Sequence, residues 1–188
     1  MTGPTPSQTI GPFFHIGLPF KGGSELIDPA SPHAIQIEGR VLDGNGDPVS
    51  DCMIEIWQAD ENGYYNHPDD PHFGERDENF SGFGRIHPDE DGRFSFVTCK
   101  PGCVAGPGNS LQAPHIMVSI FARGLLDRLV TRIYFGDEAE ANLHDPLLNG
   151  IADPALRRTL IAEPDKTAGR YRFDIHLQGD GETVFFDI

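Results

Sequence analysis

Apolar residues alternate with polar ones along most of the chain, and this period of two constrains the fold more than any other feature. Ile35, Ile37 and Val41 follow the pattern before the turn sequence DGNGDP. A segment in which every second side chain is apolar fits a strand with one buried face, because an amphipathic helix repeats every 3.6 residues instead. We therefore expect the chain to be built mainly from β-strands.

Six further segments have this alternation or the β-branched and aromatic content that suits strands. They are MIEIWQA from Met53, RFSFVTC from Arg93, HIMVSIFA from His115, LVTRIYF from Leu129, YRFDIHL from Tyr171 and TVFFDI from Thr183. The turn sequences DENG and DEDG punctuate the earlier part of this series. The alternating aromatic residues are assigned to the core, namely Trp57, Phe94, Phe96, Phe121 and Phe173.

Two segments are expected to be helical. DEAEANLH begins at Asp137, and DPALRRTLIAE begins at Asp153, which would be the N-cap with Pro154 at the first helical position. Many short strands with one or two short helices before the last strands indicate an all-β fold, a β-sandwich. The acidic segment DDPHFGERDENF, from Asp69, has no periodicity and is expected to be a solvated loop.

Charge excludes two classes of partner. The 188 residues carry a formal net charge of −15, which repels the phosphates of nucleic acids and the surface of anionic membranes. We therefore expect no nucleic-acid and no membrane partner. A small anionic substrate would also be repelled, so a site for it would need a locally placed arginine or backbone N–H groups.

The cysteines and the first residues favour a reducing compartment. Cys52, Cys99 and Cys103 are odd in number and lack zinc or redox spacing, so they are expected to be buried apolar groups or unused thiols. The opening sequence has neither a basic region nor a continuous apolar run, as a signal peptide would. A cytoplasmic location is the expectation.

The first 20 residues contain no charged side chain, yet they are rich in large apolar residues and in proline and glycine. Prolines prevent a continuous helix, and the apolar side chains would form an exposed patch if nothing covered them. We expect an extended N-terminal arm over residues 1–22 and a single domain over residues 23–188. Composition leaves open whether the arm covers its own domain or another chain.

The run IEIWQADENGYYNH, followed by GFGR, KPG and APHI, resembles the intradiol ring-cleaving dioxygenases. The resemblance implies a β-sandwich on which two tyrosines and two histidines bind ferric iron. The tyrosine positions are Tyr65, at the end of the WQA signature, and Val104, just after KPG. The histidine positions are His115 and Met117. Half of the ligand set is thus replaced.

Coordination chemistry predicts that this chain alone does not hold iron. Fe(III) is a hard ion that prefers anionic oxygen and imidazole, and valine offers no donor while methionine offers a soft thioether. Tyr65 and His115 are therefore interpreted as vestigial. A rearranged site that uses His67, His72 or His87 is the less favoured alternative, and Cys103 is expected to be a packed core group.

A retained tyrosine and histidine with the other two ligands replaced resembles the iron-free chain of two-chain family members. Their resemblance to this chain extends from TPSQTIGPFFHIGL to GETVFFDI. It implies a homologous β chain that holds Fe(III), the substrates protocatechuate and O2, and a higher hetero-oligomer. It also implies substrate-binding positions at Thr9, Gly11, Pro12 and Arg132, with no catalytic residue on this chain alone.

Alternatives stay open at each level. Arg132 could instead form an ordinary salt bridge, and the three arm residues could simply shape a turn. The chain could be a self-sufficient dioxygenase for catechol or hydroxyquinol, although such an enzyme should retain the missing ligands. It could also be a transthyretin-like β-sandwich that binds ligands and joins no catalytic complex, in which case an uncharged arm has no evident use.

Overall fold

The computed structural model describes residue 11 and residues 13–187. Helix α1 (Phe14–Gly17) is followed by β1 (Ala34–Leu42), β2 (Met53–Trp57), β3 (Phe83–Ile86) and β4 (Arg93–Cys99). Next come β5 (Val104–Ala105), β6 (Leu111–Gln112), β7 (His115–Phe121) and β8 (Leu129–Phe135). The chain continues with α2 (Ala139–His144), α3 (Pro146–Gly150), α4 (Pro154–Arg158), β9 (Ile161–Pro164), β10 (Arg170–Arg172) and β11 (Ile175–His176).

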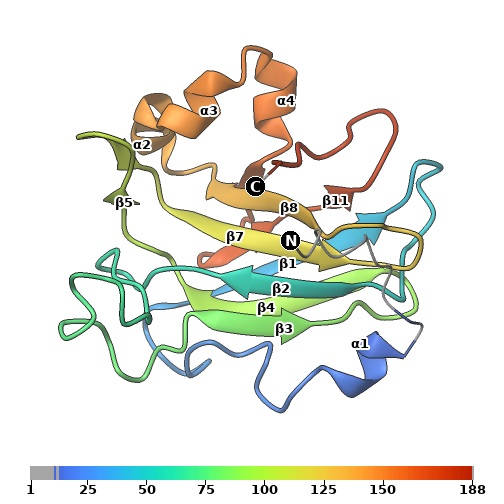
Figure 1. Cartoon of the computed structure of the whole chain (residues 1–188), viewed down its shortest axis with the longest axis horizontal. Coiled ribbons are helices and arrows are strands. Elements are labelled where there is room, and N and C mark those ends of the chain that lie inside the picture. Colours follow the sequence, from blue (N-terminus) through green and yellow to red (C-terminus); the bar gives the residue numbers. More distant parts are fainter. Residues whose placement is uncertain (1–10, 12, 188) are drawn as a thin grey trace, which may run out of the picture.

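Nine of these strands form one continuous sheet in the order β11-β1-β10-β9-β8-β7-β2-β3, with β4 paired to β1. The pairs β1–β4, β2–β7 and β7–β8 are antiparallel, whereas β1–β10 and β8–β9 are parallel. The small antiparallel pair β5–β6 lies apart from this sheet. Figure 1 shows how the sheet curls, so that β7, β8 and β2 lie in front of β1. The mainly β prediction is confirmed.

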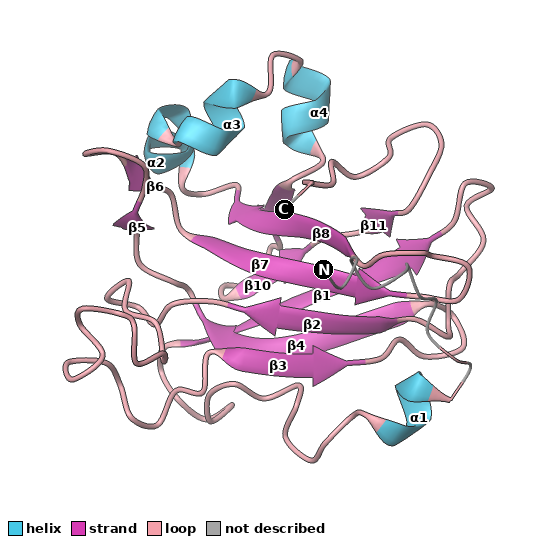
Figure 2. Ribbon diagram, in the orientation of Figure 1, coloured by secondary structure: helices cyan, strands magenta, loops and turns pink. Residues whose placement is uncertain are grey.

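The main core lies inside the curled sheet and contains the inward residues of β1, β2, β4 and β7, including Ile37, Ile54, Phe96 and Ile116. A second apolar cluster of Ala113, Tyr134, Leu148 and Leu160 lies where the helices meet β8. Helices α2, α3 and α4 lie together beyond β8, and α1 lies at the other end of the molecule (Figure 2). Helices α2, α3 and α4 thus gather on one side of the molecule, next to β8.

The predicted helix from Asp153 is correct only in its first half. Asp153 caps α4 by accepting a hydrogen bond from the backbone N–H of Ala155, but the helix ends at Arg158. Residues 161–164 form β9 instead, because Ile161 and Ala162 pair with Tyr134 and Phe135 of β8. Helix α3 and the short strands β3, β5, β6 and β9 were not predicted, since they are too brief to show a period. Helix α1 was not predicted either, because residues 1–22 were expected to be extended.

The predicted strand TVFFDI does not form over residues 183–187, the part of it that the structure describes. The backbone N–H groups of Thr183, Val184 and Phe186 donate to the His176 carbonyl, the Thr159 hydroxyl and the Val130 carbonyl, respectively. These acceptors belong to three separate segments, so no regular ladder develops. The β-branched and aromatic content of this segment favours a strand, but the hydrogen-bond acceptors that it meets do not belong to one neighbouring strand.

The predicted strand YRFDIHL is divided into β10 and β11. At the break, an oxygen of the Asp174 side chain accepts a hydrogen bond from the Arg40 backbone N–H at 2.9 Å. Of the predicted core aromatics, Phe94, Phe96 and Phe173 are buried. Trp57 and Phe121 are only half-buried, so the core assignment is wrong for these two residues.

The described part of the arm is short. Thr9 and Pro12 lie outside the described residues, whereas Gly11 is exposed and precedes α1. Phe20 stacks on Phe83 of β3 with ring centroids 6.2 Å apart. The proposed boundary between residues 1–22 and 23–188 stays a prediction. Within the described residues, no helix is long and apolar enough to cross a membrane.

Candidate functional site

The four positions that the family resemblance predicts as iron ligands lie on one loop and two strands. Tyr65 is in the loop after β2, Val104 begins β5, and His115 and Met117 share one face of β7. The antiparallel register places Tyr134 opposite His115 and Arg132 opposite Met117. A cavity of about 680 Å³ opens beside Tyr65 and Val104. The fold therefore gathers these positions around β7, β8 and the cavity.

His115 is held as a neutral imidazole. Its side chain is buried, and its Nδ1 lies 2.7 Å from the carbonyl oxygen of Ala113. A carbonyl can only accept, so Nδ1 carries the proton in the neutral ring. Burial, helped by the positive charge of Arg132, lowers the pKa of His115 to about 4. The imidazole is consequently uncharged near neutral pH.

Tyr65 is held as a neutral phenol. Its ring stacks on Trp57 at 5.9 Å between centroids, and its backbone N–H donates to Asp70 at 2.8 Å. Burial raises the pKa of the Tyr65 phenol, while the positive charge of Arg132 opposes this shift. A phenol that resists deprotonation is a poor ligand until a metal ion supplies enough charge to ionise it.

Arg132 lies at the centre of these side chains. Its Nη1 donates to Gln112 Oε1 at 2.7 Å and to the Tyr134 hydroxyl at 3.2 Å, and its Nε lies 3.2 Å from Met117 Sδ. No ion pair to Arg132 occurs among the described residues, so the salt-bridge alternative has no support there. The guanidinium is instead satisfied by neutral groups of its own chain.

Behind Arg132, Tyr134 and Asp145 complete the network. The Tyr134 hydroxyl donates to Asp145 Oδ1 at 3.3 Å, and both side chains are fully buried. Asp145 also accepts from the backbone N–H groups of Ala113, Leu147 and Leu148 at 2.8 to 2.9 Å. One carboxylate therefore caps α3 and fixes the segment that leads into His115.

The residues present do not fit a ferric ion. Val104 has no donor, and the Met117 sulfur is a soft donor that already contacts Arg132 Nε. A permanent cation near His115 and Tyr65 would repel a second, more highly charged cation. Both the positive charge of Arg132 and the set of donors thus disfavour ferric iron at these positions.

The alternative histidine donors do not assemble either. His67 and His72 line the cavity, but each lies beside a neighbouring carboxylate, Asp69 or Asp70, at 3.7 and 3.6 Å. In the described part of the chain, no group of three or more histidine, cysteine, aspartate or glutamate side chains is arranged to hold a metal.

The cysteines divide into two kinds. Cys52 and Cys99 are buried as predicted, and burial raises the pKa of each thiol to about 12. Cys103 is exposed at the cavity, so its prediction as a packed core group is wrong. Next to it, the backbone of Gly102 lies against that of Gly63, so a side chain added at either glycine would meet backbone atoms.

Sequence reasoning missed Gln112, Tyr134 and Asp145 as parts of the site. Asp145 had a usable signal, because an aspartate before Pro146 is typical of a helix start. Gln112 had none, since only the fold brings it to Arg132. The acidic loop from Asp69 contains no helix or strand and is largely exposed, as expected.

The comparisons with known proteins identify the family. A dioxygenase family model matches residues 27–179. The protocatechuate 3,4-dioxygenase α chain of Pseudomonas putida is 45% identical over 197 residues, which cover 97% of this chain and 96% of that protein. The corresponding β chain of Burkholderia cepacia is 38% identical over 157 residues, with 79% of this chain and 66% of that protein covered.

A solved structure agrees with this assignment. The dioxygenase domain of a carbohydrate-binding fusion protein from Streptomyces sp. SirexAA-E superposes with a TM-score of 0.60 at 26% identity, and covers 94% of this chain and 99% of that domain. The chain therefore belongs to the intradiol ring-cleaving dioxygenase family, and over nearly its whole length it is similar to the α chains of protocatechuate 3,4-dioxygenase.

Proposed function

We propose that this chain is the iron-free α subunit of a protocatechuate 3,4-dioxygenase, which opens protocatechuate with O2 to 3-carboxy-cis,cis-muconate. The observation that carries the proposal is Arg132, which places a fixed cation among the degenerate ligand positions. Similarity to α chains over nearly the whole length supports it further. The chemistry would belong to a homologous β chain that holds Fe(III), within a higher hetero-oligomer.

The surface around α1 supports a partner-binding role for the N-terminal region. Phe13 and Ile16 are 75% and 69% exposed, and Leu18 and Phe20 are about half exposed. Large apolar side chains gathered in one short segment are typical of protein interfaces. We propose that residues 1–22 dock on the β chain, where Thr9, Gly11 and Pro12 would line the substrate pocket.

Substrate binding by Arg132 stays a prediction, and the contacts that its guanidinium makes within the chain weaken the physical case for it. The three contacts of its guanidinium lie within this chain, and Arg132 is half-buried. An arginine held in this way would have to exchange these contacts for a substrate carboxylate. If Arg132 binds the substrate carboxylate, Arg132→Ala in the complex should raise KM for protocatechuate while the iron content stays constant. An unchanged KM would mean that Arg132 interacts only within its own chain.

The fold type and the cellular location are part of the same proposal. We infer that the curled sheet is a β-sandwich of the intradiol type, which the similarity to the solved dioxygenase domain supports. We also infer a cytoplasmic location, which the three free cysteines support.

Expression with and without a candidate β chain tests the proposal. The chain alone should be colourless and inactive, and the co-expressed complex should show the red charge-transfer band of tyrosinate bound to Fe(III), together with ring cleavage. Iron content measured in the same samples should follow the colour. Colour and turnover from this chain alone would favour the self-sufficient alternative, and failure to associate with any β chain would favour a binding protein.

A further inference from the structure

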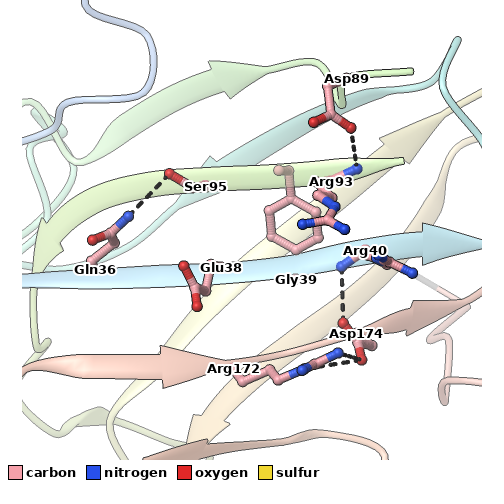
Figure 3. Close-up of a pocket in the computed structure, with 10 residues that line it drawn as sticks. Gln36, Glu38, Gly39, Arg40, Asp89, Arg93, Ser95, Arg172 and Asp174 are labelled. Carbon is pink, nitrogen blue, oxygen red and sulfur yellow. Dashed lines mark hydrogen bonds and ion pairs between the residues drawn. The ribbon is translucent and has the colours of Figure 1, made fainter. Parts of the chain in front are cut away.

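A second cavity, of about 490 Å³, lies on the outer face of β4, β1 and β10, on strands that contribute nothing to the site around Arg132. Three arginines line it, one from each strand: Arg93, Arg40 and Arg172. Figure 3 shows them in succession across the three strands. A chain with 14 basic and 29 acidic residues thus places three arginines around one small cavity.

Arg40 and Arg93 are direct cross-strand partners. The antiparallel register of β1 and β4 pairs them, so both side chains leave the same face of the sheet. Like charges at directly opposite positions destabilise a sheet. Arg172 joins them on this face, because the parallel register of β1 and β10 pairs it with Glu38, two residues before Arg40.

The charge of Arg40 has no hydrogen-bonded or ionic partner in the part of the chain that the structure describes. Only its backbone N–H is engaged, by Asp174, and among the described residues its guanidinium has no hydrogen-bond or ion-pair partner. Arg93 has one distant partner, Asp91 at 3.7 Å, and both of these side chains are exposed. Arg40 is half-buried, so its donors lie in a partly enclosed position without an acceptor.

Two of the three acids in the cavity are already engaged. Asp174 accepts from the Arg40 backbone and from Arg172 Nη2 at 3.0 Å. Asp89 Oδ1 accepts from the backbone N–H groups of Asp91 and Arg93, where it closes a turn. The third acid, Glu38, has no hydrogen-bonded or ionic partner for its side chain within the described residues. It would oppose a ligand that carries dense negative charge.

We propose that this cavity binds a small polycarboxylate, with one carboxylate between Arg40 and Arg93 and another toward Arg172. Guanidinium groups bind carboxylates through paired N–H donors, and such a ligand would relieve the repulsion within the arginine pair. Adjacent strands are about 4.8 Å apart, so the three arginines suit charges spread along a molecule. The cavity volume is that of a small-molecule site.

The product of the proposed ring cleavage belongs to this class of polycarboxylate ligands. Opening the ring of protocatechuate between its two hydroxylated carbons adds two carboxylates to the one already present, so the product is a tricarboxylate. Binding of product at this cavity would make it a regulatory site. This last step rests on the proposed function, whereas binding of a polycarboxylate does not.

Calorimetric titration of the full chain with tricarballylate, at constant ionic strength, tests the site. Saturable binding is expected for the tricarboxylate, while acetate at the same carboxylate concentration and inorganic phosphate should bind much more weakly. Arg40→Gln should weaken tricarballylate binding by about tenfold or more, since a charge-assisted pair is lost. Glu38→Gln should strengthen binding severalfold, because it removes the unpaired acid.

Arg158→Gln is the matched control, because Arg158 is exposed on α4 and does not line the cavity. Its affinity should equal that of the unmodified chain. A thermal melt gives a second readout, in which tricarballylate raises Tm of the unmodified chain but not of Arg40→Gln. Equal affinities for Arg40→Gln and the unmodified chain, or equal binding of acetate and tricarballylate, would overturn the proposal. Neither readout depends on iron or on ring cleavage.

Discussion

Arg132 and Arg40 are both half-buried arginines on strands of the same sheet, yet their surroundings differ. Arg132 donates to Gln112 and Tyr134 and contacts Met117, so it is bound by its own chain. The Arg40 guanidinium has no partner among the described residues and faces a second arginine across the β1–β4 pair. The comparison shows that the hydrogen-bond and ion-pair partners of these two arginines distinguish them, whereas their burial does not. An arginine bound by its own chain stabilises the fold, and one without such partners is available to a ligand.

The largest expected effect concerns the pH dependence of stability near Arg132. His115 has a pKa of about 4 in the folded chain, below its ordinary value of 6.5, so the unfolded chain binds a proton first as pH falls. The stabilisation is complete above pH 6.5 and is lost as pH falls toward 4, by about 3 kcal/mol. Denaturant unfolding across this range measures it.

His115→Gln supplies the control for that experiment, since glutamine does not titrate. The difference in unfolding free energy between the two proteins should shrink from pH 7 to pH 4, while other acid-dependent losses cancel. A difference that stays constant with pH would mean that His115 is not held neutral.

Removal of Arg132 should have the next largest effect. Arg132→Met leaves Gln112 Oε1 without its donor and the Tyr134 hydroxyl without its contact, so we expect a loss of about 2 kcal/mol in unfolding free energy. The pKa of His115, followed by NMR, should rise only in part, because burial is the larger cause of its shift. A stabilised variant would show that Arg132 is kept for a role outside its own fold.

Removal of Arg40 should have the smallest effect and the opposite sign. Arg40→Gln relieves the like-charge pair with Arg93 and breaks no side-chain hydrogen bond or ion pair among the described residues, so unfolding free energy should rise by about 0.5 kcal/mol in the absence of ligand. Added salt should reduce this gain, because the charges are partly exposed. A loss of stability comparable to that of Arg132→Met would remove the contrast between the two arginines.

Much of the fold could be read from alternation. The strand at 93–99 has the predicted bounds because its burial largely alternates. The strand at 129–135 also has the predicted bounds, although it is buried on both faces, because its β-branched and aromatic content favours a strand. Residues 161–163 and 183–187 were misassigned, because a parallel pair with β8 and scattered hydrogen-bond acceptors decide their conformation. The degenerate ligand positions could also be read directly, as Val104 and Met117 are matters of residue identity.

The sequence by itself determined that this chain is mainly β, because that follows from the alternation of its residues. It also determined that, at two of the four positions that the family resemblance predicts as iron ligands, valine and methionine replace donors that suit ferric iron, because that is a matter of residue identity. The tertiary structure decided which charges meet. Strand register places Arg132 against Met117 and Arg40 against Arg93. Register depends on core packing and on pairing between distant segments, so no local sequence pattern contains it.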